Sequence, residues 1–150
     1  MSILTGPEIE YRVRQTRDSK ARGYTAASAR FLPWIDVEPW RPEMCGPNSL
    51  DVHLGDTLVR YADAEPVINP DWPPATEPVP LDYRAVAGGP LYWKLSPGTL
   101  YLGATAERVA CHGVVPWIDG RSSVGRLGVS VHVTAGRGDD GWPGPDREPA

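Results

Sequence analysis

The sequence predicts an all-β domain that opens with one short helix. Short apolar runs recur after residue 50, and turns rich in Gly and Pro separate them, which is typical of a β-barrel or a β-sandwich. The 150 residues include 16 Gly and 17 Pro, a content that favours short strands over long helices. Helical periodicity is confined to the first 22 residues, and the length is that of one domain of usual size.

The helix is expected to run from Thr5 to about Arg22. Thr5 and Glu8 stand at the spacing of a capping box, with a proline between them just inside the helix. Ile9 and Val13 then lie on one face, which predicts the side that packs on the sheet. Basic residues gather toward the far end, where they complement the helix dipole.

Two strands are expected next, on residues 50–55 and 57–61, because apolar and polar residues alternate in both. Gly55-Asp56 between them is a turn signal. The stretch from Pro66 to Pro80 contains six prolines, so it is expected to be an extended surface loop.

The second half of the chain continues the strand pattern. Strands are expected at residues 91–95, 100–104 and 114–118, and the turns between them at residues 96–98 and 111–113. Val129, Val131 and Val133 alternate with polar residues, which predicts one more strand with one packed face. Residues 138–150 contain little apolar material and are expected to be a frayed end.

Composition and charge exclude several classes of function. The net charge is −4, whereas proteins that bind nucleic-acid polymers carry a basic surface. No apolar run is long enough to cross a membrane and no secretory leader is recognisable, so a cytoplasmic protein is expected. Cys45 and Cys111 are the only cysteines. A zinc deaminase needs three His or Cys ligands and a nearby Glu. The two cysteines are far apart and the sequence has no Cys-x-x-Cys pair and no His-x-Glu motif, so no zinc is expected.

The segment from Asp119 to Gly128 carries the densest chemistry. Two arginines bracket Ser122 and Ser123 among three glycines. Arginine offers a planar fork that matches phosphate oxygens, and glycine lets the backbone approach an anion closely. This pattern suits a triphosphate. The alternative is a Gly-rich loop whose arginines form ordinary surface ion pairs.

Residues 119–136 resemble the central motif of the dCTP deaminases, members of the dUTPase-like superfamily. That motif reads approximately Gly-(Arg/Lys)-Ser-Ser-Leu-(Ala/Gly)-Arg-Leu-Gly-Leu-x-x-His-x-Thr-Ala. Residues 47–55 resemble the family's Pro-x-Ser-x-Asp-Leu-Arg-Leu-Gly strand, and residues 95–107 resemble its Leu-x-Pro-Gly-x-x-x-Leu-(Ala/Gly)-x-Thr-x-Glu segment. The resemblance runs from about residue 3 to Trp142, with the Pro-rich stretch as an insertion.

The resemblance implies a distorted jelly-roll, a β-barrel of the dUTPase-like type, assembled as a homotrimer with active sites between subunits. It implies conversion of dCTP to dUTP and ammonia by zinc-independent attack of water on the cytosine ring. Some members of the family also hydrolyse the product to dUMP and pyrophosphate. The expected ligands are dCTP and dUTP, Mg²⁺ that arrives with the triphosphate, and dTTP as a candidate inhibitor. No nucleic-acid polymer and no membrane is expected as a partner.

By position, the resemblance also implies a set of substrate-binding residues. The set is Arg121, Ser122, Ser123, Val124, Gly125, Arg126, Val133, Thr134 and Asp139. Ser122 and Arg126 are expected to assist at the attacked ring as well. Val133 and Thr134 would border the base and the nucleophilic water. Asp139 matches the Asp of the family's Ile-Asp-Pro-Gly-(Trp/Phe) segment, which holds the deoxyribose side.

The general-base Glu of the family is not found. By ungapped count it falls on Pro149, and Glu148 is a weak candidate because a one-residue shift on a strand reverses the face. Residues 1–144 are therefore interpreted as an incomplete deaminase-like domain and 145–150 as a divergent tail. The open alternatives are a truncated or frame-shifted deaminase, a nucleotide-binding relative without catalysis, and a chain completed by a partner. A dUTPase-type diphosphohydrolase is the alternative reaction.

Overall fold

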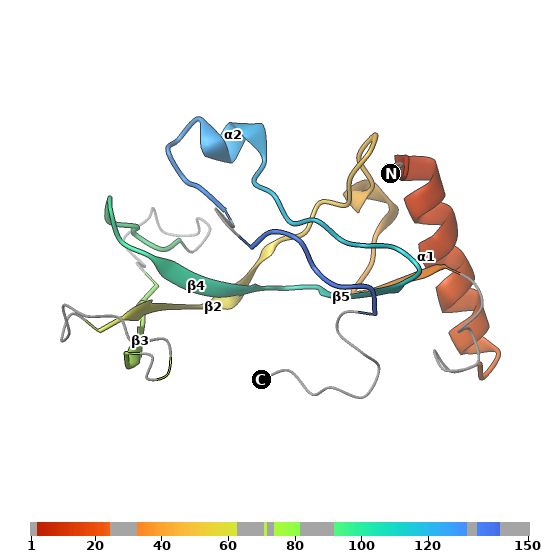
Figure 1. The fold of residues 1–150 in the computed structure, drawn as a ribbon, viewed down its shortest axis with the longest axis horizontal. Helices are drawn as coiled ribbons and strands as arrows, with labels where there is room; N and C mark the ends of the chain where they lie inside the picture. The colour runs from red at the N-terminus through yellow and green to blue at the C-terminus, as the bar shows by residue number, and fades with distance from the viewer. Residues whose placement is uncertain are drawn as a thin grey trace, which may run out of the picture. The chain divides into compact units, whose positions relative to one another are not determined.

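The computed structural model describes residues 3–24, 33–62, 71, 74–81, 92–131 and 135–141. The chain divides into two compact units. The helical unit comprises residues 1–51 and 107–150, and the sheet unit comprises residues 52–106. The described elements are mainly strands with an N-terminal helix (Figure 1), which confirms the predicted all-β class. Neither sheet closes within these residues, so the jelly-roll and the homotrimer stay predictions.

The predicted N-terminal helix is confirmed as α1, Gly6–Ala21. Thr5 and Glu8 form the capping box: the Glu8 Oε2 atom accepts hydrogen bonds from the Thr5 amide at 2.9 Å and the Thr5 hydroxyl at 2.8 Å. These bonds stabilise the carboxylate and hold the pKa of Glu8 below its usual value. Ile9 and Val13 are buried, as expected of the face that packs on the protein.

The helical unit is built on a two-stranded antiparallel sheet of β1, Trp34–Glu38, and β5, Arg108–His112. Figure 1 shows α1 beside this pair, with the helix axis crossing the direction of the strands. The core between helix and strands is formed by Ile9, Val13, Ile35, Val37, Met44 and Cys111. A single 3₁₀ turn, η1, spans Pro42–Met44 and contributes Met44 to that core.

Neither strand of this pair was predicted. Ile35 and Val37 alternate with Asp36 in β1, and this alternation was a usable sequence signal for the strand. In β5, the turn expected at residues 111–113 is wrong for Cys111 and His112, because both still belong to the strand. The chain turns at Gly113, the last residue of the expected turn, whose φ of +71° is a conformation that glycine adopts without strain.

The sheet unit holds three antiparallel strands in the order β3-β2-β4. They are β2, Leu54–Tyr61; β3, Thr76–Pro78; and β4, Tyr101–Thr105. The prediction of a strand at residues 100–104 is confirmed by β4. The expected loop from Pro66 to Pro80 is wrong where β3 forms, and β3 is an edge strand, the place where a sheet tolerates proline. Residues 66–70, 72 and 73 of that stretch lie outside the described residues.

The expected turn at Gly55-Asp56 is also wrong. Strand β2 runs through it, and the register against β4 shifts between Leu54 and Leu58. A bulge commonly uses glycine, and a Cβ on Gly55 would lie 3.0 Å from the Ala104 carbonyl oxygen. Residues 51–53 are not in a strand, so the strand predicted from residue 50 begins only at Leu54.

Three further strand predictions fail in the described residues. Residues 92–95 hold only an isolated bridge at Tyr92, and residues 129–131 hold no strand. Within 114–118 a single bridge joins Trp117 to Arg137, because the neighbouring Pro116 has no N–H to extend a ladder. No helix in the described part of the chain is long and apolar enough to cross a membrane.

Candidate functional site

The Arg/Ser/Gly segment folds into one helical turn, α2, Ser122–Gly125, and not into the Gly-rich loop that the sequence suggested. The Arg121 carbonyl accepts hydrogen bonds from the amides of Val124 and Gly125, both at 2.9 Å. The Arg126 amide donates to the Ser122 carbonyl at 3.1 Å. The turn therefore holds Arg121 at its beginning and Arg126 at its end, with Ser122 and Ser123 exposed between them.

The two ends of this segment are fixed locally. The Gly120 amide donates to Asp119 Oδ1 at 2.7 Å. A Cβ on Gly120 would meet the Val131 side chain at 3.5 Å, so the chain returns to this point after the turn. Gly128 leaves the turn with a φ of +80°, which requires glycine for an unstrained backbone. Residues 119–131 therefore form a loop whose two ends lie close together, with α2 between them.

Arg121 has a carboxylate partner that the sequence did not indicate. Its Nη1 atom lies 3.5 Å from Asp51 Oδ2, and 72% of the Arg121 side chain is exposed. The Asp51 backbone is held in turn by a 2.7 Å hydrogen bond to the Met44 carbonyl. Asp51 lies in the motif at residues 47–55, so the contact joins two segments that resemble the same family. The ion-pair alternative for the arginines therefore holds for Arg121.

Arg126 is different. It is exposed, and no acidic side chain in the described part of the chain pairs with it. Arg126, the exposed Arg121 with its single contact to Asp51, and two exposed serine hydroxyls give α2 a surface rich in positive charge and hydrogen-bond donors. The chain as a whole has a net charge of −4. Such a surface favours an anion with several oxygens, because guanidinium groups bind phosphate with paired hydrogen bonds.

Asp139 is exposed, in a segment that pairs with residues 116–118. The Ile118 amide donates to the Gly136 carbonyl at 2.7 Å, and the Gly138 amide donates to the Pro116 carbonyl at 3.0 Å. The expected frayed end is therefore wrong for residues 138–141. They are held by these bonds and by the Asp140 side chain, which accepts a hydrogen bond from the Gly113 amide. Within the described residues, Asp139 has no hydrogen bond or ion pair with the α2 residues. Val133, Thr134 and Glu148 lie outside them.

The cysteines are free thiols. Burial raises the pKa of Cys111 to about 11, and the nearby Asp140 carboxylate adds to the effect. Burial also raises the pKa of Cys45. A raised pKa keeps a thiol protonated and unreactive. These side chains are therefore part of the packing, with Cys111 Sγ donating to the Val114 carbonyl at 3.4 Å.

The donor set around α2 also bears on magnesium. Mg²⁺ prefers oxygen ligands, above all carboxylates and phosphates. The groups at the tip of α2 are guanidinium ions and hydroxyls, which bind phosphate. This chemistry fits an ion carried by the triphosphate oxygens and does not make α2 a metal site of its own.

Comparison with known proteins gives a consistent result. The model of the dCTP deaminase-like family matches residues 27–146. A relative from Leptospira biflexa, named "dCTP deaminase, dUMP-forming", is 39% identical over 110 residues, which cover 73% of this chain and 58% of the relative. One from Rhodopirellula baltica, named "dCTP deaminase", is 36% identical over 73% of this chain and 51% of its own length. One from Hathewaya histolytica, named "dCTP deaminase, dUMP-forming", is 36% identical over 95% of this chain and 67% of its own length.

The match is unequal in length. The chain spans about 58% of the length of the Leptospira relative. The family match includes α2, the motif at residues 47–55 and the segment with Asp139. It does not test the individual roles of the site residues, nor the boundary at residue 144, and these stay predictions.

Proposed function

The chain belongs to the dCTP deaminase family, and on that premise we propose that it acts on dCTP and removes the amino group of the cytosine ring. The observation that carries the proposal is α2, where Arg121 and Arg126 flank two exposed serines in the segment with the family's central motif. We assign α2 to the triphosphate of the nucleotide.

The physical basis is charge and geometry. A nucleoside triphosphate carries several negative charges, and an arginine pair on one helical turn can meet its oxygens from two sides. Arg126 is the stronger candidate, because Asp51 competes for Arg121. Ser122 and Ser123 add hydroxyl donors, and Mg²⁺ would screen the remaining phosphate charge. The other proposed substrate contacts are Val124, Gly125, Val133, Thr134 and Asp139.

The reaction adds water to the ring carbon that bears the amino group and expels ammonia, so that dCTP becomes dUTP. A base must accept a proton from the water, and a donor must stabilise the charge that develops on the ring. We assign the donor role to Ser122 and Arg126. The base is not assigned to any described residue, and Glu148 is its weak candidate.

The names of two relatives support a second step. The Leptospira and Hathewaya proteins are named dUMP-forming, whereas deamination alone would end at dUTP. We therefore extend the proposal to dUMP as the end product, with dUTP as the intermediate. The second step is attack of water on the α-phosphorus, which releases pyrophosphate.

A time course with dCTP and magnesium tests both steps. Purified protein is incubated with dCTP, and in parallel with dUTP, and the nucleotides are separated by chromatography while ammonia is assayed. The expected result is release of ammonia from dCTP and accumulation of dUMP. Accumulation of dUTP would overturn the second step alone. Unchanged dCTP would overturn the deaminase proposal, and conversion of dUTP only would point to a diphosphohydrolase.

A matched pair of variants ties any turnover to α2. Arg126→Ala removes the cation at the end of α2, which pairs with no acidic side chain among the described residues, and is expected to abolish most of the activity. Arg22→Ala removes another exposed cation, just after α1, and is expected to leave the activity unchanged. Equal activities of the two variants would contradict the role of α2.

A further inference from the structure

We propose that Asp140 is a positioning residue that anchors the segment 135–141 to the end of β5 and thereby holds Asp139 toward the sugar side of the nucleotide. The proposal deepens the proposed function and rests on it. It adds a role for a side chain that lies beside the predicted site residues and was not among them.

The contact is a short hydrogen bond to a fixed donor. The Gly113 amide donates to Asp140 Oδ1 at 2.6 Å. A charged acceptor makes such a bond stronger than a neutral one. The donor has little freedom, because Gly113 takes a positive φ and a Cβ there would lie 3.0 to 3.1 Å from three atoms of Pro33. The backbone N–H therefore points to the place where the Asp140 carboxylate lies.

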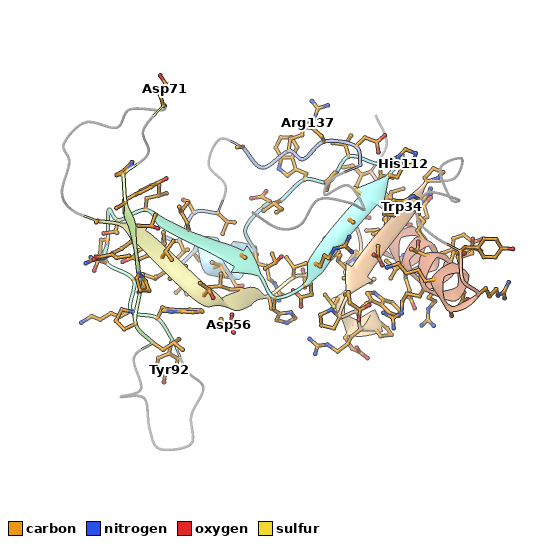
Figure 2. All side chains as sticks on the ribbon, turned by 90° about the horizontal axis from the view of Figure 1, so that it is seen from below. Trp34, Asp56, Asp71, Tyr92, His112 and Arg137 are labelled. Atoms are coloured by element: carbon orange, nitrogen blue, oxygen red, sulfur yellow. The ribbon has the colours of Figure 1, made fainter. Side chains whose placement is uncertain are left out.

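The segment is anchored on its other side by backbone bonds. Trp117 and Arg137 form an antiparallel bridge, and the Gly138 amide donates to the Pro116 carbonyl at 3.0 Å. Figure 2 labels Arg137 on this segment. Asp139 is thus the one residue between two anchors, the backbone bond of Gly138 and the side-chain bond of Asp140. Loss of either anchor would leave Asp139 tied on one side only.

His112 completes the contact. Its Nδ1 atom lies 3.5 Å from Asp140 Oδ1. The ring is placed by Trp34, with the ring centroids 6.2 Å apart and the planes tilted by 33°. Figure 2 shows the two side chains at the same end of the β1–β5 pair. The carboxylate of Asp140 therefore has two neighbours at the end of β5, the backbone amide of Gly113 and the His112 side chain that contacts Trp34.

The test uses Asp140→Ala and Asp140→Asn, with Asp56→Ala as the matched control. Asp56 is an exposed carboxylate of β2, in the sheet unit. The asparagine keeps an oxygen that can accept from Gly113, and the alanine does not. Amide hydrogen exchange at Gly113 reports the contact directly. In Asp140→Ala this exchange should accelerate by roughly tenfold, as expected for loss of one hydrogen bond to a charged group. Exchange at Val37 in the core should not change.

Binding separates positioning from general damage. Affinities for dCTP and for inorganic triphosphate are measured with magnesium for each protein. Asp140→Ala should weaken dCTP by roughly three- to tenfold and leave inorganic triphosphate unchanged, because Asp139 is assigned to the sugar and α2 to the phosphates. Asp140→Asn should restore most of the affinity. A variant that merely unfolds would lose both ligands and the protection of Val37.

The outcomes are distinguishable. If the wild type binds dCTP and Asp140→Ala binds it with the same affinity, the positioning role is overturned and the proposed function is unaffected. If the wild type does not bind dCTP, the proposed function fails. The exchange at Gly113 then decides the anchor alone: unchanged exchange in Asp140→Ala overturns it, and faster exchange supports it.

Discussion

Asp51 limits how freely one of the two α2 cations can meet a ligand. Its carboxylate lies 3.5 Å from Arg121, whose side chain is 72% exposed, while the Asp51 side chain is 36% exposed. A phosphate group must compete with Asp51 for Arg121 and is also repelled by its charge. Exposed ion pairs contribute about 0.2–1 kcal/mol, so the effect is modest and can be measured.

We therefore expect Asp51→Asn to bind dCTP more tightly, by roughly two- to fivefold at low salt. The gain should shrink as the ionic strength rises, since salt screens exposed charges. Asp56→Asn removes the same charge from β2 and serves as the control. Calorimetric titration of the three proteins measures the effect. Weaker binding by Asp51→Asn would mean that Asp51 orients Arg121 for the ligand.

Cys111 gives a second prediction at the scale of one residue. With a pKa of about 11 and almost no exposure, roughly 0.1% of the thiol is ionised at pH 8. Cys111 should therefore resist alkylation in the folded protein and react fully in denaturant. Because the pKa of Cys111 is raised in the folded protein, the protonated thiol contributes fully to the free energy of unfolding below the pKa of the unfolded chain. That contribution is lost as the pH rises from about 9 to about 11. Rapid labelling at pH 8 in the folded state would contradict this.

At the scale of elements, Asp36 connects α1 to the β1–β5 pair. Its side chain is 6% exposed, and it forms ion pairs with Lys20 of α1 and, at 3.0 Å, with Arg108 of β5. Both cations are about half exposed, so they can return to water if the carboxylate is lost. The cost of losing Asp36 should therefore fall below that of a fully buried pair.

We expect Asp36→Ala to lower the free energy of unfolding by about 1–3 kcal/mol. Glu38→Ala is the control on the same strand. Its pair with Arg17 spans 3.4 Å and Glu38 is 64% exposed, so its loss should cost less than about 1 kcal/mol. Urea unfolding of both variants tests the difference. Equal effects would show that α1 depends on apolar packing alone.

The elements that the sequence predicts well are those with local causes. Helix α1 follows from its cap and from the spacing of Ile9 and Val13. The β1–β5 pair was missed because its partners are far apart in the chain: Asp36 and Arg108 are separated by 72 residues. The same limit hid Asp51 as the partner of Arg121. The residues of α2 were found from their chemistry, but the helical turn was not, since Ser and Gly are typical of loops.

At the scale of the whole molecule, the homotrimer is still a prediction. Large apolar side chains of the sheet unit are exposed in the single chain, among them Leu54, Leu100 and Leu102. Apolar surface of this kind is stabilised when a second surface covers it. We expect light scattering after size-exclusion chromatography to give about three times the chain mass of 16.3 kDa. A monodisperse species of one chain mass would contradict the trimer.

The most direct test of the account is a calorimetric titration of the protein with dCTP in magnesium, repeated with Arg126→Ala and with Arg22→Ala. We expect saturable binding by the wild type and by Arg22→Ala. Arg126→Ala should lose roughly 10- to 100-fold in affinity, because a charged hydrogen-bond donor to the triphosphate is removed. Equal affinities in all three proteins, or no binding by the wild type, would contradict α2 as the triphosphate site.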